Sequence, residues 1–306
     1  MNDRIDVHHH ASAPSWVREV EHFAPSRPVR PWTPHDALRA MDHHHVARAV
    51  VSLTAPGVWF GDAARAVPAA HAANEELAAS VLAPGNDGRL AFFAALPLPD
   101  VEATLAEIEH ASALGCAGYT LLTNVDGRYL GDPEFAPVWA ELDRRRAVVF
   151  VHPNWTTQPL VPGVSGAIAD FLLDTVRTAI SLLYAGVLDR HRDVSIILSH
   201  AGGFLPYNVH RLAAMSATML EPRRDAEQLL ADARRFYFDT ALSTSPTSLP
   251  SLLAFADPQR ILYGTDWPYA LSPTIEYFER EFAAYPLAEE QRSAIEHDNA
   301  RRLFGW

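Results

Sequence analysis

Short apolar segments recur along the chain, and helical or polar segments separate them. Most are almost continuously apolar, such as Val148-Val149-Phe150-Val151 and Val194-Ser195-Ile196-Ile197-Leu198. Uninterrupted apolar runs of this length are typical of strands that are covered on both faces in a parallel sheet. We predict eight strands, at Arg4–His10, Arg48–Thr54, Leu90–Leu98, Ala117–Asn124, Val148–Pro153, Asp193–His200, Phe236–Leu242 and Ile261–Trp267.

The segments between these strands carry apolar residues at helical spacing. We predict helices at Pro34–Met41, Ala63–Ala83, Val101–Leu114, Pro133–Arg145, Ile168–Asp189, Leu205–Met219 and Ser248–Ala256, with closing helices within Pro286–Phe304. Strand alternating with helix eight times predicts an α/β fold, a (β/α)8 TIM barrel. The rival doubly wound sheet is disfavoured because no Gly-rich phosphate loop follows a strand.

The residues between the first two strands are rich in proline at their start, and we expect them to form a small cap insertion over the barrel mouth. No internal repeat, low-complexity segment or linker divides the chain. We therefore expect residues 1–306 to form a single domain.

Composition narrows the class of protein. The formal charge of −12 over 306 residues argues against nucleic acid as a partner. No apolar stretch is long enough to span a membrane, and the single cysteine, Cys116, excludes an intrachain disulfide, so we expect a cytoplasmic protein. The chain contains no lysine, and all 25 basic residues are arginine. Schiff-base chemistry and a metal bridge through a carboxylated lysine are therefore both excluded.

Metal-binding residue types stand at the ends of several predicted strands. His8 and His10 end the first strand and share one face, because side chains alternate along a strand. His152, His200 and Asp266 end the fifth, sixth and eighth strands. In a barrel all strand ends meet at one face, where the chemistry takes place. A lone histidine there is usually a hydrogen-bonded core residue, but four with an aspartate predict a metal site. Three imidazoles and one carboxylate suit one divalent ion, zinc by default, with manganese or cobalt as alternatives.

These motifs together resemble the amidohydrolase superfamily. The closest resemblance is to the branch that contains aminocarboxymuconate-semialdehyde decarboxylase and the 6-methylsalicylate and γ-resorcylate decarboxylases. The matching segments are Ile5-Asp6-Val7-His8-His9-His10, Leu130-Gly131-Asp132-Pro133-Glu134-Phe135, Val149-Phe150-Val151-His152-Pro153, Ser199-His200-Ala201-Gly202-Gly203, Tyr263-Gly264-Thr265-Asp266-Trp267-Pro268 and Asn299-Ala300-Arg301-Arg302-Leu303-Phe304. The resemblance implies that His8, His10, His152 and Asp266 hold the metal and that His200 is the nearby acid/base. The missing lysine fits the branch that uses one metal ion.

The resemblance also suggests residues that bind substrate. Arg211 lies eleven residues after His200, a spacing that in the decarboxylase belongs to an arginine reaching the carboxylate in a neighbouring subunit. This implies a homodimer, and the alternative is a surface arginine on a helix. Arg30, in the expected cap, is a candidate partner for the carboxylate within the same chain.

Other residues are assigned more loosely. Trp155, Trp59, Phe60 and Trp16 follow strand ends and are candidates to sandwich a flat ring, although any one of them alone is more typical of packing. The triplet His43-His44-His45 precedes a strand and is expected in a solvated turn at the opposite mouth. Asp239 either orients a ligand or caps a loop, and we leave both open.

Two reactions use this set of residues. The first is non-oxidative decarboxylation of a small aromatic or dienoic carboxylic acid, in which Asp266 or His200 supplies the proton. The second is hydrolysis of a lactone, amide or ester by an activated water, with His200 and Asp266 as base and acid. The ligands alone do not separate the two. The aromatic residues near the strand ends and the resemblance favour the decarboxylase.

Overall fold

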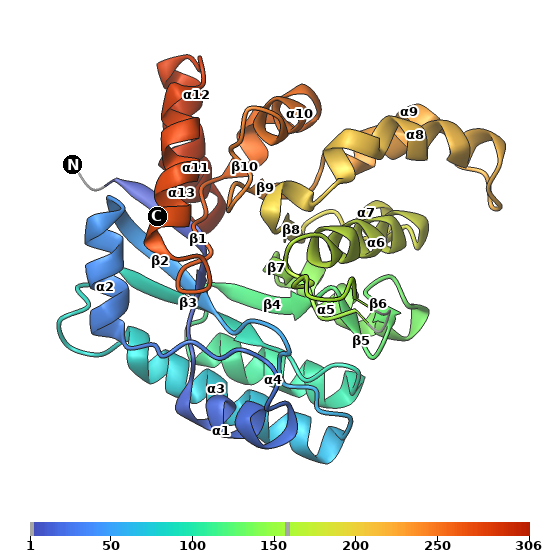
Figure 1. The fold of residues 1–306 in the computed structure, drawn as a ribbon. Helices are drawn as coiled ribbons and strands as arrows, with labels where there is room; N and C mark the ends of the chain where they lie inside the picture. The colour runs from blue at the N-terminus through green and yellow to red at the C-terminus, as the bar shows by residue number, and fades with distance from the viewer. Residues whose placement is uncertain (1–2, 157–159) are drawn as a thin grey trace.

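Eight parallel strands form the centre of the molecule (Figure 1), and the computed structural model describes residues 3–156 and 160–306. Each strand pairs with the next one in chain order, apart from a separate hairpin between the fourth and fifth. In this order they are β1 (Arg4–His10), β2 (Val46–Ser52), β3 (Leu90–Ala95), β4 (Gly118–Leu122), β7 (Val148–His152), β8 (Ser195–Leu198), β9 (Tyr237–Asp239) and β10 (Ile261–Leu262).

The barrel closes where β1 meets the residues that follow β10. Val7 N donates to Tyr263 O at 3.0 Å, and His10 N donates to Trp267 O at 2.7 Å. The buried carboxylate of Asp6 accepts hydrogen bonds from the Thr265 backbone N–H at 3.1 Å and from its hydroxyl at 2.6 Å. These bonds join the first and last strands, which confirms the predicted (β/α)8 barrel.

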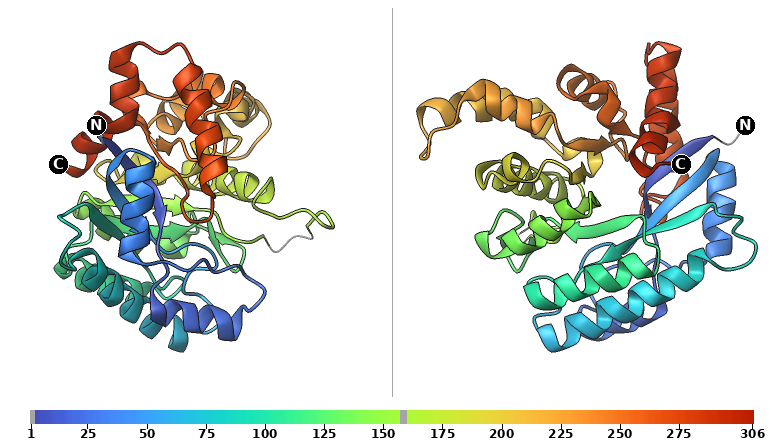
Figure 2. Two further views of the ribbon diagram at one scale, coloured as in Figure 1. Left: turned by 60° about the vertical axis from the view of Figure 1, so that its left-hand side comes forward. Right: turned by 180° about the vertical axis from the view of Figure 1, so that it is seen from behind.

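Helices surround the strands on the outside (Figure 2). They are α1 (Pro14–Phe23), α2 (Pro34–His43), α3 (Ala63–Val81), α4 (Val101–Ala113), α5 (Ala136–Arg144), α6 (Asp170–Tyr184), α7 (Val187–Arg190), α8 (Leu205–Thr218), α9 (Ala226–Ala233), α10 (Ser248–Phe255), α11 (Ser272–Ala284), α12 (Glu289–Ser293) and α13 (Asn299–Phe304). Short turns of other helix types lie at η1 (Pro133–Phe135), η2 (His200–Gly202), η3 (Pro258–Arg260) and η4 (Ala294–Asp298), and the separate hairpin is β5 (Asn124–Val125) and β6 (Arg128–Tyr129). Within the described ranges, no helix combines the length and apolar character that crossing a membrane requires.

The predicted helices are present at the expected positions. One of them is divided into two helices, and three further helices were not predicted. The predicted helix Ile168–Asp189 is interrupted by Gly186, whose φ of +63° is left-handed and ends α6 before α7 begins. The sequence pattern did not predict α1, α9 and α11. The buried residues of α11 are Ile275 and Phe282, and a stripe this thin gives little periodic signal.

The structure corrects the expectation for the triplet His43-His44-His45 at the opposite mouth. His43 and His45 are exposed, as a solvated turn requires, but His44 is buried. Its Nδ1 lies 3.1 Å from Glu279 Oε2 on α11. His44 therefore anchors a helix that the sequence pattern did not reveal.

Candidate metal centre and active site

The four predicted metal ligands converge at the carboxyl end of the barrel. His8 and His10 end β1, His152 ends β7, and Asp266 follows β10. One ligand atom from each of the four lies within 4.8 Å of the others. The Nε2 atoms of His8 and His10 are 3.1 Å apart, and Asp266 Oδ1 lies 3.3 Å and 3.1 Å from them. Two ligands of one ion are separated by about this distance when each bond is about 2.1 Å long.

Hydrogen bonds behind the histidines fix which nitrogen faces the centre. His8 Nδ1 donates to Asp239 Oδ2 at 2.8 Å, and His10 Nδ1 donates to the Ser52 carbonyl at 3.3 Å. His152 Nδ1 donates to the Pro153 carbonyl at 2.9 Å. In the neutral imidazole this leaves the lone pair on Nε2, so three lone pairs face one point. Such partners behind a ligand orient it and raise its basicity.

The electrostatics of the four groups favour a bound cation. Burial lowers the pKa of His152 well below its usual range, and repulsion from His10 and His8 adds to this, so His152 stays neutral. Burial also lowers the pKa of His10. Burial opposes ionisation of Asp266, but hydrogen bonds from His10, His200 and His8 hold its pKa well below the usual range. Neutral imidazoles and a carboxylate are the forms that bind metal.

His8 shows that these atoms require positive charge among them. Burial lowers its pKa, but the Asp239 carboxylate and then Asp266 outweigh burial and raise it to about 10. The two carboxylates thus favour positive charge at this point, and the residues present fit a divalent ion. Asp239, which the sequence left unassigned, orients this ligand from the end of β9, while its Oδ1 accepts from the backbone N–H groups of His200 and Ala241 at 2.9 Å each. The available signal was an acidic residue directly after the apolar run Phe236-Tyr237-Phe238 of a predicted strand.

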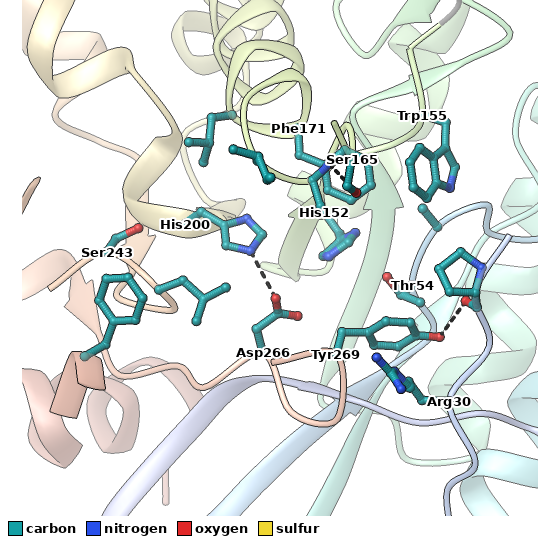
Figure 3. Close-up of a pocket in the computed structure, with 17 residues that line it drawn as sticks. Arg30, Thr54, His152, Trp155, Ser165, Phe171, His200, Ser243, Asp266 and Tyr269 are labelled. Carbon is teal, nitrogen blue, oxygen red and sulfur yellow. Dashed lines mark hydrogen bonds and ion pairs between the residues drawn. The ribbon is translucent and has the colours of Figure 1, made fainter. Parts of the chain in front are cut away.

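His200 lies beside this centre. It follows β8 in a turn with a φ of +52°, and its Nε2 lies 3.5 Å from Asp266 Oδ2 (Figure 3). Asp266 thus turns Oδ1 toward His8 and His10 and Oδ2 toward His200. This geometry lets His200 exchange a proton at the edge of the metal site, the role that the resemblance implies for it.

A cavity of about 460 Å³ opens above the centre. His152, His200 and Asp266 reach its floor, while His8 and His10 are fully buried behind it. Its other lining residues are Pro28, Arg30, Thr54, Ala55, Trp155, Ser165, Ala167, Ile168, Phe171, Leu172, Leu242, Ser243, Tyr269 and Phe278. In the view of Figure 3, Arg30 and Tyr269 lie on the opposite side of the Asp266–His200 pair from Ser243. An apolar pocket with few polar groups is typical of sites for small organic molecules.

Two of the three predicted substrate-binding residues line this cavity. Arg30 borders it from the segment between α1 and α2, and Trp155 borders it after β7. The Trp155 ring meets Phe171 edge-on at 4.9 Å, and the Arg27 guanidinium lies 4.3 Å from its centre. Arg211 is exposed on α8. Among the described residues of this single chain, it does not line the cavity. Its role from a neighbouring subunit stays a prediction.

The other aromatic candidates have different places. Within the part of the chain that the structure describes, Trp16, Trp59 and Phe60 do not border the cavity. Trp16 is fully buried and donates from Nε1 to the Gly57 carbonyl at 2.8 Å, so it is a packing residue. The sequence analysis missed Tyr269, whose position three residues after Asp266 was the available signal, and Phe278, which lies on the unpredicted α11.

Comparisons with known proteins find similar proteins over nearly the whole chain. The family model described as amidohydrolase matches residues 5–306. A 6-methylsalicylic acid decarboxylase of Penicillium expansum is 38% identical over 98% of this chain and 96% of that protein. The crystal structure of a 2,6-dihydroxybenzoate decarboxylase complexed with 2,6-dihydroxybenzoate has a TM-score of 0.84 at 27% identity and covers 100% of both chains. A dihydroxybenzoic acid decarboxylase of Polaromonas sp. JS666, with bound manganese and the inhibitor 2-nitroresorcinol, has a TM-score of 0.80 at 25% identity and covers 100% of this chain and 97% of that one.

Proposed function

This chain belongs to the amidohydrolase family, and from that premise we propose that it is a metal-dependent decarboxylase of a small 2-hydroxybenzoic acid. The observation that carries the proposal is the position of Asp266, whose two oxygens join the ligand histidines to His200 at the floor of an aromatic-walled cavity. The relatives that cover nearly the whole chain are named for 6-methylsalicylic and 2,6-dihydroxybenzoic acids. Both acids carry a hydroxyl next to the carboxylate, and we extend this substrate class to the present chain.

The residues divide the reaction between them. His8, His10, His152 and Asp266 would hold a divalent ion, which when bound supplies an electrostatic clamp for the carboxylate and the adjacent hydroxyl. Trp155 and Phe171 offer ring faces and edges to an aromatic substrate. Arg30, which lines the cavity, would offer a cation to the carboxylate.

The proton comes from the His200–Asp266 pair. A proton held between His200 Nε2 and Asp266 Oδ2 moves to the ring carbon that bears the carboxylate. The bond from this carbon to the carboxylate then breaks, its electron pair restores the aromatic ring, and carbon dioxide leaves. No oxidant or further reactant is needed.

We propose zinc as the ion, because three imidazoles and one carboxylate suit it, with manganese or cobalt as the alternatives. One relative is described with manganese bound. Protein stripped of metal by a chelator should be reloaded separately with Zn²⁺, Mn²⁺ and Co²⁺. We expect Zn²⁺ to restore the most activity. We further propose that residues 1–306 form a single domain, because no linker segment divides the sequence. We also propose a cytoplasmic location, because Cys116 is the only cysteine in the sequence.

We also propose a homodimer in which Arg211 completes the partner's site. Apolar side chains are exposed at the beginnings of α6 and α8, beside the cavity, and Ile168 and Tyr207 are 67% and 85% exposed. Gly203 brings the two helices together there, since a Cβ at this position would lie 2.1 Å from the Leu172 carbonyl. Arg211 lies one turn after Tyr207 and shares its exposed face. Exposed apolar area next to an active site is typical of an interface.

The decisive experiment is an assay of metal-loaded protein. With 6-methylsalicylate or 2,6-dihydroxybenzoate it should release carbon dioxide, and benzoate without the hydroxyl should react far more slowly. Chelation should abolish the reaction, and the reloaded ion should restore it. If the protein released acid from lactones or aryl esters and no carbon dioxide from either hydroxybenzoate, it would be a hydrolase and not a decarboxylase.

A further inference from the structure

A second group of metal-binding side chains lies on the outside of the barrel, between α3 and α4. These two helices run side by side (Figures 1 and 2). His71 and Glu75 stand one turn apart on α3, and His110 faces them from α4. One ligand atom from each of the three lies within 4.8 Å of the others. Glu75 Oε1 is 3.7 Å from His71 Nε2 and 4.0 Å from His110 Nε2.

His71 is held with the correct nitrogen toward this group. Its Nδ1 donates to Glu107 Oε2 at 3.1 Å, which leaves the lone pair on Nε2, the atom that faces Glu75. Glu107 is only 5% exposed, and its Oε1 accepts from Asn74 Nδ2 at 2.7 Å. Asn74 in turn exchanges hydrogen bonds with the N–H and carbonyl of Ala95, at the end of β3, at 2.8 Å and 2.9 Å. A carboxylate behind a histidine is the usual support of a metal ligand.

His110 supplies an unsatisfied nitrogen. Its Nε2 is buried and has no hydrogen-bond partner among the described residues. A buried polar atom without a partner costs free energy unless a water or an ion satisfies it. The His110 ring stacks on the His71 ring with their centres 4.0 Å apart, so both Nε2 atoms lie near Glu75.

We propose that His71, Glu75 and His110 form a second divalent-metal site, which binds a borderline transition-metal ion such as Zn²⁺ and joins α3 to α4. Two imidazoles and one carboxylate are a ligand set that suits zinc, and water completes the coordination. The present distances exceed the roughly 3.3 Å between two ligands of a tetrahedral zinc ion. Binding therefore requires a small shift of these side chains, which the exposed positions of Glu75 and His71 allow while His71 Nδ1 keeps its hydrogen bond to Glu107.

The site is tested by zinc content in the full-length protein whose barrel-mouth site is already loaded. After dialysis against metal-free buffer, wild type and variants should each retain one ion. In micromolar Zn²⁺ the wild type should take up one more ion per chain, and His110→Ala should not. His35→Ala removes one of the two exposed histidines of α2 and serves as the matched control that still takes up the second ion.

Two further measurements separate a built site from a chance group of surface residues. Glu107→Gln changes no ligand, but it should weaken Zn²⁺ binding at this site about 10–100-fold by removing the charge behind His71. Zn²⁺ should raise the unfolding midpoint of the wild type by about 2–4 °C and leave that of His110→Ala unchanged. Should His110→Ala fail to fold, Glu75→Gln, at an exposed position, makes the same comparison. Equal zinc uptake by wild type and ligand variant, or loss of uptake in His35→Ala, would overturn the site.

Discussion

The Asp239 carboxylate lies 2.8 Å from His8 Nδ1, so the last residue of β9 orients the first metal ligand of β1. Both side chains are fully buried. The other Asp239 oxygen accepts from the backbone N–H groups of His200 and Ala241, so this aspartate must present acceptors on both sides. An amide cannot do this, because one of its two ends is a donor.

Asp239→Asn should therefore lower metal affinity. If the amide nitrogen faces His8, the His8 proton moves to Nε2 and blocks the ligand position. If it faces the backbone, two N–H groups lose their acceptor. We expect a loss of about 10–100-fold in affinity, measured by competition with a chromophoric chelator.

Asp174→Asn is the matched control for this change. Asp174 is also buried, and it accepts from Asn124 Nδ2 at 2.7 Å, from the Tyr129 hydroxyl at 2.8 Å and from the Thr123 hydroxyl. Among the described residues it has no hydrogen bond to any of the four metal ligands. It should lower the unfolding midpoint without changing metal affinity. Equal metal affinity in Asp239→Asn and wild type would contradict the orienting role.

His200→Ala should keep the metal and lose turnover. His200 faces Asp266 Oδ2 at 3.5 Å, whereas the ligand atoms of the site come from His8, His10, His152 and Asp266. Loss of a positioned acid/base lowers kcat by about 10²–10⁴. Elemental analysis beside steady-state kinetics checks both parts, with His152→Ala as the variant that should lose the ion. A metal-free His200→Ala protein would make His200 a ligand.

Arg211→Ala and His152→Ala should partly rescue each other when mixed under conditions that allow subunit exchange. Each variant alone should be inactive, the first for want of the partner's arginine and the second for want of a metal ligand. Half of the randomly mixed dimers contain both chains, and each has one complete site of two, so activity should approach about one quarter of wild type.

The control mixture pairs His200→Ala with His152→Ala, whose defects both lie within their own chain's site. It should stay inactive. Demonstrated exchange without recovery in the first mixture, or a fully active monomer by sedimentation, would leave Arg211 as a surface residue.

Glu279 should make the fold sensitive to acid. Burial raises its pKa, but hydrogen bonds from His44 and Tyr263 and the charge of Arg4 outweigh burial and lower the pKa below the ordinary value of 4.5. A group with a lowered folded pKa stabilises the protein above its unfolded pKa, and this contribution is lost as pH falls through the folded pKa. Glu279→Gln should cost roughly 1.5–3 kcal/mol near neutral pH, and the cost should shrink below about pH 4.5.

Urea unfolding of wild type and Glu279→Gln from neutral pH to below about pH 4.5 measures whether the stability difference shrinks as expected. Glu276→Gln, on the same helix, is the control, because its pair with His43 at 2.9 Å is exposed on both sides. Such a pair contributes about 0–1 kcal/mol. If the difference in the free energy of unfolding between wild type and Glu279→Gln were the same at every pH, the ionised carboxylate would not be its cause.

The sequence alone determined the barrel and most of its centre. Continuous apolar runs indicated strands covered on both faces, and the polar residue that ends each run indicated the face where the ligands meet. His8, His10, His152, His200 and Asp266 were predictable as one group in this way, because strand periodicity and barrel symmetry relate distant positions. The family resemblance, and not the periodicity, separated the four expected ligands from His200. Gly186, by contrast, breaks a predicted helix that apolar spacing alone extended through it.

Only the tertiary structure decided the contacts between elements that sequence spacing does not relate. Asp239 reaches His8 across 231 positions, and the buried His44 meets Glu279 on a helix with a thin apolar stripe. His71 and Glu75 share a helix face by their spacing, but the packing of α3 on α4 brings in His110. Local periodicity determines which face of a helix or strand a side chain occupies. The packing of helices and strands determines which residues that face contacts, and the sequence of a single segment does not contain this information.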